Sequence, residues 1–166
     1  RFRRVPIRGS YRRVDIASAY TTHLLEYVYP APSRPLKVVV NPGNGSAGPI
    51  LDRLEGYLPM GLERLNHEPD GHFPNGVPNP LLPENREVTG AAVRETGADF
   101  GVAWDGDFDR CFLFDEQGAF IEGYYLISLL AEDLLREHPG AKVLHDPRLT
   151  WSTIERVQSL GGLPVQ

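Results

Sequence analysis

The sequence predicts an α/β fold, a mixed sheet with helices packed on it, followed by a partial second α/β unit. Short apolar runs rich in β-branched residues alternate along the chain with longer segments of helical spacing. The length of 166 residues suits one domain, or one domain and part of another. The composition, with 41% hydrophobic and 23% charged residues, is typical of a globular protein and argues against wholesale disorder.

Charge is distributed unevenly along the chain. The first 14 residues carry six arginines and no acid, whereas the other 152 residues carry 11 basic and 22 acidic side chains. We interpret residues 1–14 as a basic lead-in segment. It has no apolar stripe and no interleaved aromatics beyond Phe2 and Tyr11, so we expect no nucleic-acid partner. The only methionine is Met60, and we therefore expect the chain to be part of a longer protein.

The compartment is predicted from two simple features. No stretch of about 18 residues is continuously apolar, so we expect no membrane segment. A single cysteine, Cys111, permits no intrachain disulfide, which fits a reducing compartment. We therefore expect a cytoplasmic protein.

The first elements are predicted from periodicity and turn residues. Residues 15–28 predict a helix, since Ile16, Tyr20 and Leu24 fall on one side and Asp15 is placed to cap its start. The proline-rich stretch 30–35 predicts a connector. The apolar run 37–41 predicts a buried strand, and the glycine-rich turn 41–48 leads from it into a helix over 49–58 and a strand over 62–67.

The middle of the chain combines a long loop with strands. Residues 69–83, dense in proline, glycine and asparagine, predict the loop, and residues 84–96 predict a helix that stops at Gly97. Residues 100–104 form an apolar run typical of a buried strand. A hairpin follows, with strands over 111–114 and 119–121. We assign residues 15–120 to one domain.

The last segment, 121–166, predicts a second unit. A helix is expected over 122–138, a strand over 142–146, a helix over 150–160 and the start of a strand over 163–166. We expect the first of these helices to face inward through Tyr125, Leu126, Leu129, Leu130 and Leu134. The unit lacks part of a sheet, so we expect it to be the less stable part and to self-associate through its open strand.

The chemistry is concentrated in Asp105, Asp107 and Asp109, which directly follow the strand predicted at 100–104. Alternate side chains of an extended segment share a face, so all three carboxylates can meet. At about 4 Å, each pair repels by roughly 4 kcal/mol at an effective dielectric near 20. Such a cluster needs a cation, and oxygen ligands suit magnesium, manganese or calcium. The neighbouring Arg110 adds a permanent cation suited to phosphate.

Other interpretations of this segment stay open at this stage. A solvated acidic turn would have the same composition. An EF-hand loop that begins at Asp105 would place a ligand at Glu116, but Arg110 stands where that loop requires glycine. An aspartyl phosphatase would use Asp105 as nucleophile and a downstream lysine, for which Lys142 is the only candidate. A small divalent-metal-binding module without enzymatic activity is the remaining alternative.

Several segments together resemble the α-phosphohexomutases, the superfamily of phosphoglucomutases and phosphomannomutases. They occur in the order NPGNGSAG (41–48), PDGHFPN (69–75) with PE (83–84), and DGDFDR (105–110). The run DGDFDRCFLFDE (105–116), then IEGYY (121–125) and HDPR (145–148), resembles the bacterial phosphomannomutase branch. Phe108 replaces a glycine common in the superfamily.

The resemblance implies the end of a linker, a complete second domain and the first half of a third, out of four domains around a cleft. It implies that Asp105, Asp107 and Asp109 bind Mg²⁺, and that Arg110 and Arg148 contact the sugar phosphate substrate. It implies interconversion of mannose 6-phosphate and mannose 1-phosphate through a phosphoserine on another domain. The 166 residues contain no Thr-x-Ser-His-Asn segment for that serine. We therefore expect no catalytic nucleophile here, an inactive isolated chain, and the remaining domains as partners.

Overall fold

The computed structural model describes residues 9–28 and 34–166. The predicted connector at 30–35 and the start of the basic lead-in segment lie largely outside these described residues. None of the helices in the described ranges is both long and apolar enough to cross a membrane.

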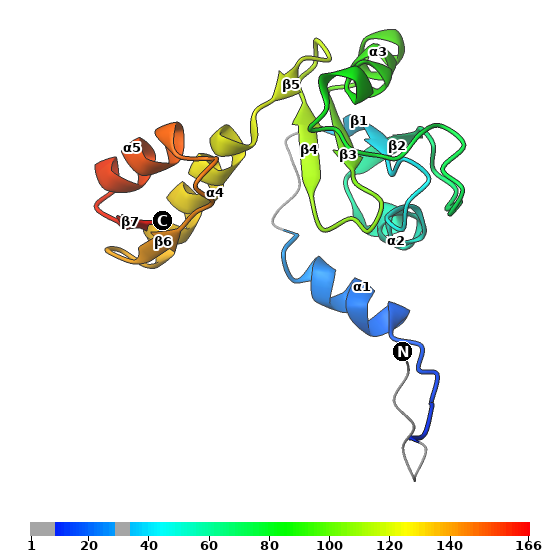
Figure 1. The fold of residues 1–166 in the computed structure, drawn as a ribbon, viewed down its shortest axis with the longest axis horizontal. Helices are drawn as coiled ribbons and strands as arrows, with labels where there is room; N and C mark the ends of the chain where they lie inside the picture. The colour runs from blue at the N-terminus through cyan, green and yellow to red at the C-terminus, as the bar shows by residue number, and fades with distance from the viewer. Residues whose placement is uncertain (1–8, 29–33) are drawn as a thin grey trace, which may run out of the picture.

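A five-stranded mixed sheet forms the centre of the larger unit (Figure 1). Its order is β2-β1-β3-β4-β5, in which β1 runs parallel to β2 and β3, and β4 runs antiparallel to β3 and β5. The mixed α/β sheet that the sequence predicts is therefore confirmed. The strands are β1 (Leu36–Asn41), β2 (Met60–Arg64), β3 (Phe100–Trp104), β4 (Cys111–Phe114) and β5 (Phe120–Ile121).

Two helices cover opposite faces of this sheet. Helix α2 (Gly48–Leu54), extended by a 3-10 turn over Glu55–Tyr57, packs on the face of Val38 and Val40. Helix α3 (Glu87–Thr96), preceded by a 3-10 turn over Pro83–Asn85, covers the other face. It ends at Gly97 with φ 62°, the left-handed conformation predicted for this stop. The core on the α3 face consists of Val39, Val93, Ala98, Ala103, Phe112 and Phe114.

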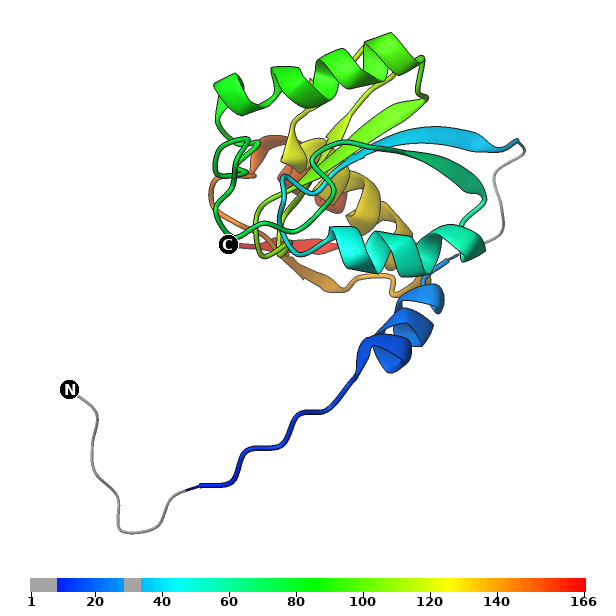
Figure 2. The ribbon, with the colours of Figure 1, turned by 90° about the vertical axis from the view of Figure 1, so that its right-hand side faces the viewer.

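Helix α1 (Ala17–Leu25) is shorter than the predicted helix over 15–28 and lies at the start of the described chain. The Asp15 carboxylate accepts a hydrogen bond from the backbone N–H of Ala17 at 2.9 Å, so it does stabilise the start of the helix. Residues 9–16, which precede α1, extend away from the sheet (Figure 2). Only Thr21 of α1 is buried, so the helix has little core of its own.

A second unit follows β5 and forms a separate body in Figure 1. It contains α4 (Gly123–Glu137), β6 (Lys142–Leu144), α5 (Trp151–Ser159) and β7 (Leu163–Val165). Strands β6 and β7 pair in parallel as a two-stranded sheet. Its core is small, built on Ala131, Leu135 and Val157.

The inward face predicted for α4 is wrong except at Leu126, which is partly buried. Tyr125, Leu129, Leu130 and Leu134 are each more than half exposed, and the buried residues are Ser128, Ala131 and Leu135. Helix α4 meets α5 through this narrower stripe, where the hydroxyls of Ser128 and Ser152 are 2.8 Å apart. The small side chains of Ser128 and Ala131 allow the two helices to approach closely. Leu129, Leu130 and Leu134 lie on the side of α4 that does not face α5.

Candidate metal centre

Asp105 lies at the carboxyl end of β3, and Asp107 and Asp109 follow in the loop that leads to β4. One carboxylate oxygen from each residue lies within 4.8 Å of the other two. Asp105 is only 3% exposed, while Asp107 and Asp109 are open to solvent. The cluster therefore has one buried and two accessible carboxylates.

A turn, and not an extended strand, brings the carboxylates together. The N–H of Phe108 donates to the Asp105 carbonyl at 3.1 Å, and the N–H of Asp105 donates to the Arg110 carbonyl at 3.4 Å. Phe108 has φ 50°, a left-handed conformation that costs energy for a residue with a Cβ. The expectation of alternating faces on an extended chain is thus wrong in its geometry, although its result, the convergence of three carboxylates, is present.

Arg110 holds the buried member of the cluster. Its Nε and Nη2 lie 2.7 Å and 2.6 Å from Asp105 Oδ2, and its backbone N–H donates to Asp105 Oδ1 at 3.1 Å. Burial acts to raise the pKa of Asp105, but these hydrogen bonds from Arg110 outweigh it and lower that pKa. About half of the Arg110 side chain stays exposed, so the guanidinium is also available to an anion.

The charges of the cluster do not cancel. The negative charge of Asp107 acts most strongly on Asp109 and raises its pKa above the usual range. Three carboxylates and one guanidinium leave an excess of two negative charges at this edge of the sheet. This excess is the electrostatic condition that a divalent cation relieves.

The three aspartates fit such a cation. Magnesium holds its oxygen ligands at about 2.0–2.1 Å, so that two of them stand at most about 4.2 Å apart, and calcium allows slightly more. The spread of 4.8 Å requires only a small contraction of the loop. Each carboxylate oxygen has two lone pairs, so Asp105 can keep Arg110 and still bind a metal. An EF-hand does not fit, because strands β3 and β4 flank the loop.

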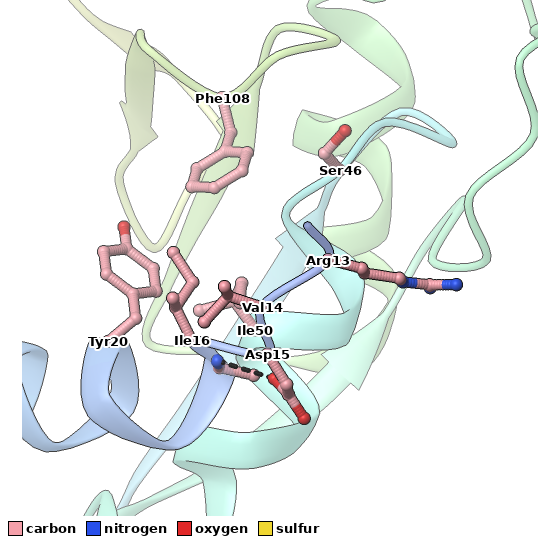
Figure 3. A pocket seen from close by; sticks show the side chains of 9 residues that line it. Arg13, Val14, Asp15, Ile16, Tyr20, Ser46, Ile50 and Phe108 are labelled. Atoms are coloured by element: carbon pink, nitrogen blue, oxygen red, sulfur yellow. Dashed lines mark hydrogen bonds between the residues drawn. The ribbon is translucent and has the colours of Figure 1, made fainter. Parts of the chain in front are cut away.

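Phe108, between Asp107 and Asp109 in the sequence, borders an open apolar cavity (Figure 3). The cavity has a volume of about 790 Å³ and separates the loop from α1 and α2. Its walls come from the chain before α1, from α1 itself, and from Ser46 and Ile50. Among the residues of the loop, Phe108 is the one that lines this cavity, and the three aspartates are not part of its wall.

Arg148 lies on the second unit, at a pocket of about 370 Å³ that Arg110 and Glu122 also line. The structure thus brings the two predicted substrate-binding arginines to one pocket. Arg148 is largely exposed, and it is bound to Asp146 through its backbone N–H and through Nε and Nη2 at 2.9 Å and 2.7 Å. These bonds hold the pKa of Asp146 well below its usual range. The pairing of Arg148 with Asp146 was not predicted, although the two residues stand only two positions apart in the sequence.

The chain is similar to known sugar-phosphate enzymes. A profile described as phosphoglucomutase/phosphomannomutase, alpha/beta/alpha domain II, matches residues 18–118. A Xanthomonas campestris protein named "Phosphohexose mutases" is 60% identical over 160 residues, and a Vibrio cholerae "Phosphomannomutase" is 52% identical over 169 residues. These alignments cover 96% and 99% of this chain, and the chain spans 36% of the length of each relative.

A solved structure agrees with this similarity. The phosphoglucomutase/phosphomannomutase family protein from Burkholderia thailandensis matches with a TM-score of 0.85 and 37% sequence identity. The match covers 95% of this chain and 34% of that protein. The profile, the curated relatives and the solved structure all agree with the resemblance noted in the sequence. The chain belongs to the phosphoglucomutase/phosphomannomutase family.

Proposed function

We propose that this chain is the metal-binding part of a phosphomannomutase that interconverts mannose 6-phosphate and mannose 1-phosphate. The observation that carries the proposal is the convergence of Asp105, Asp107 and Asp109 beside Arg110. The names of the relatives supply the reaction class. The phosphoserine nucleophile would come from a segment outside these 166 residues, which contain no Thr-x-Ser-His-Asn sequence.

The residues of this chain would act mainly through charge. Bound at the three aspartates, Mg²⁺ would act as a Lewis acid toward the phosphoryl oxygens. Arg110 is oriented by Asp105 and remains half exposed, so it is placed to donate hydrogen bonds to a phosphoryl group. Arg148 would bind the far end of the sugar phosphate across the same pocket. Phosphoryl transfer depends on positioning and on electrostatic stabilisation, and these groups offer both.

The state of Asp105 favours the mutase over an aspartyl phosphatase. A carboxylate that attacks phosphorus needs a free oxygen directed at the substrate. Asp105 is buried, and both of its oxygens accept hydrogen bonds from Arg110. It is therefore better suited to hold a cation and an arginine than to act as a nucleophile.

Metal binding is tested directly on the 166-residue chain by titration calorimetry with Mg²⁺ and Mn²⁺. We expect weak binding, in the roughly high-micromolar range or weaker, because an open carboxylate site leaves several positions to water. Changing Asp105, Asp107 and Asp109 together to asparagine should abolish the binding. Binding that survives the triple change would show that the cation lies elsewhere.

Activity is tested in a chimera. Replacing the matching third of the Xanthomonas relative with this chain should give an enzyme that converts mannose 6-phosphate, and Asp105→Asn in the chimera should remove most of its turnover. The chain alone, supplied with magnesium and a hexose bisphosphate, should be inactive. A folded but inactive chimera would contradict the proposed reaction, and turnover by the chain alone would contradict the external nucleophile.

A further inference from the structure

We propose that Asn44 is a positioning residue for the metal loop, which we define as residues 105–110. The inference rests on the metal centre of the proposed function and adds to it a residue outside the metal loop. Asn44 belongs to the glycine-rich turn that follows β1, and it is buried, with 9% of its surface exposed. Asn44 is not one of the three aspartates that would bind the metal.

All four polar groups of Asn44 bind one neighbouring loop, residues 66–75. Its backbone N–H donates to the Asn66 carbonyl at 2.7 Å, and its own carbonyl accepts from the N–H of Asp70 at 2.8 Å. Its Nδ2 donates to the Glu68 carbonyl at 2.8 Å, and its Oδ1 accepts from Asn75 Nδ2 at 2.9 Å. The residue has φ 60°, a conformation that asparagine tolerates better than most residues. Asn44 thus joins the turn to the loop.

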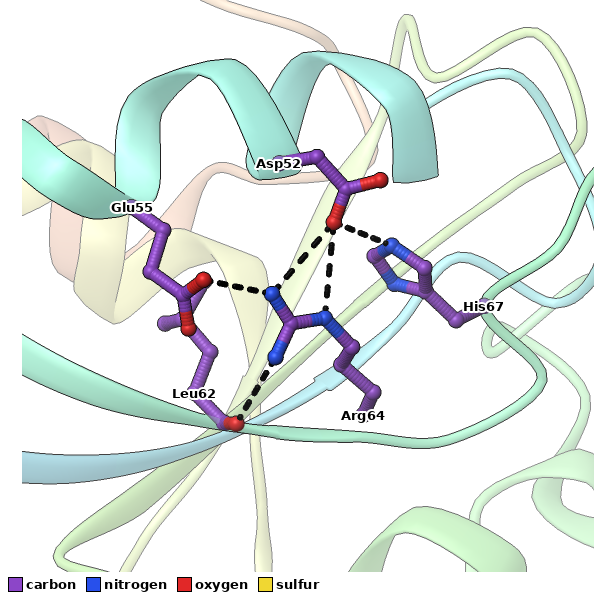
Figure 4. Close-up of polar contacts among 5 residues, drawn as sticks. All are labelled: Asp52, Glu55, Leu62, Arg64 and His67. Carbon is purple, nitrogen blue, oxygen red and sulfur yellow. Dashed lines mark hydrogen bonds and ion pairs between the residues drawn. The ribbon is translucent and has the colours of Figure 1, made fainter.

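The loop that Asn44 holds is itself anchored to α2 (Figure 4). His67, next to Asn66, places its Nε2 2.9 Å from Asp52 Oδ1 on that helix. Arg64 at the end of β2 bridges the same Asp52 oxygen and Glu55, with the Nη2–Glu55 distance at 2.6 Å. The loop is therefore held against α2 at its start, and the hydrogen bonds of Asn44 connect the same loop to the glycine-rich turn.

The glycine-rich turn and the loop over residues 66–75 both contact Gly106. The N–H of Ser46 donates to the Gly106 carbonyl at 3.0 Å. A Cβ added at Gly45 would stand 2.6 Å from that carbonyl oxygen, so the two backbones are in close contact. The Phe73 ring also lies close to Gly106, because a Cβ built at Gly106 would stand 3.2 Å from it. Ser46 belongs to the turn and Phe73 to the loop, the two segments that Asn44 joins.

These contacts matter because Gly106 lies between two of the metal ligands, Asp105 and Asp107. The direction of Asp105 and Asp107 depends on the peptide between them, and glycine by itself permits many conformations. A loop that is already ordered in the metal-free protein loses less conformational entropy when the metal binds, and its metal affinity is therefore higher. Residues that orient metal ligands typically change metal affinity by about 10-fold to 100-fold when they are removed. Asn44 should act in this way through Ser46 and Phe73.

The test uses Tb³⁺ as the probe, because Trp104 stands next to Asp105 and can sensitise its luminescence. Asn44→Gly keeps the backbone conformation but removes both side-chain bonds, and it should weaken Tb³⁺ binding at least about tenfold in folded protein. Asn75→Ala removes one bond only and should give a smaller loss of the same sign. Val93→Ala, a core change on the buried face of α3, is the matched control and should leave the affinity within about twofold.

The outcomes separate this inference from the metal centre itself. If Asn44→Gly is folded and binds as tightly as Val93→Ala at matched stability, the positioning role is overturned. If Asn44→Gly does not fold, Asn75→Ala decides in the same way. A wild-type chain that binds no Tb³⁺, or an Asp105→Asn chain that binds it equally well, overturns the metal centre and the positioning role together.

Discussion

Asp99 shows how a single carboxylate joins distant parts of the chain. The guanidinium of Arg34 binds both of its oxygens, with Nη1 3.0 Å from Oδ2, and the backbone N–H of Lys37 donates to Oδ2 at 2.7 Å. The hydrogen bond from Arg34 and then that from Lys37 lower the pKa of Asp99 to about 2. The carboxylate thereby holds the entry of β1 against the start of β3.

This pairing makes part of the stability dependent on pH. The pKa of Asp99 is lower in the folded state than the roughly 3.9 of an unfolded chain, so ionised Asp99 stabilises the fold above about pH 4. That contribution is lost as the pH falls from about 4 toward 2. We expect Asp99→Asn to lower the urea midpoint at pH 6 and to differ less from wild type at pH 3. A difference that stays constant between these pH values would contradict the role assigned to Asp99.

At the scale of elements, helix α3 depends on a close backbone approach. Gly90 in the middle of α3 faces Gly118 in the turn between β4 and β5, and a Cβ at position 90 would overlap the Gly118 carbonyl oxygen. Alanine normally stabilises a helix interior by about 1 kcal/mol relative to glycine. Here the overlap with a backbone atom reverses that preference. The turn that contains Gly118 therefore favours glycine over alanine at position 90 of the helix.

We expect Gly90→Ala to destabilise the protein by roughly 1–3 kcal/mol, as overpacking does. Equilibrium unfolding in urea measures this change. Gly123→Ala is the control, because a Cβ there would meet only Leu149 side-chain atoms at 3.8 Å or more. The control should change stability by less than about 0.5 kcal/mol. A stabilising Gly90→Ala would mean that the turn yields to the new methyl group.

At the scale of the whole molecule, the two units differ in the depth of their cores. Strand β1 lies between β2 and β3, and Val38, Val39 and Val40 are almost fully buried. Among the described residues, strand β6 pairs with β7 alone, and Leu144 is largely exposed. Opening β6 therefore exposes far less apolar surface than opening β1, and the second unit should open first.

Hydrogen exchange measures this difference. We expect amides of residues 142–145 to exchange at least about tenfold faster than those of residues 38–40 in a monomeric sample. The comparison must use the same pH and correct for intrinsic exchange rates. Equal protection in the two segments would show that the second unit is as stable as the main sheet.

The exposed side of α4 leads to a prediction about self-association. Tyr125, Leu129, Leu130 and Leu134 form an apolar face, and the β6–β7 sheet has open edges on the same unit. Apolar faces and open strand edges both favour pairing with a second copy. We expect reversible dimerisation by sedimentation velocity, with Leu130→Glu weakening it.

The control for this experiment is Val88→Glu, which changes an exposed apolar residue of α3 in the other unit. It should leave the sedimentation behaviour unchanged. If Leu130→Glu and wild type sediment alike as dimers, the contact lies elsewhere. If wild type is a monomer at high concentration, the α4 face does not self-associate.

The sequence by itself determined the features that depend on neighbouring residues. The apolar run at 100–104 became β3 with the same bounds, and Gly97 ended α3 as predicted, because strand formation and helix termination follow local chain chemistry. The clustering of Asp105, Asp107 and Asp109 was also predictable, since the residues lie within one short loop. The family resemblance rested on the same local motifs.

Only the tertiary structure decided which groups are buried and what they touch. The buried face of α4 depends on α5, and periodicity alone marked the wrong leucines because apolar residues surround much of that helix. The hydrogen bonds of Asn44 join segments that lie more than twenty residues apart in sequence. Such contacts leave no periodic signal in the chain, since they arise where separate segments meet after folding.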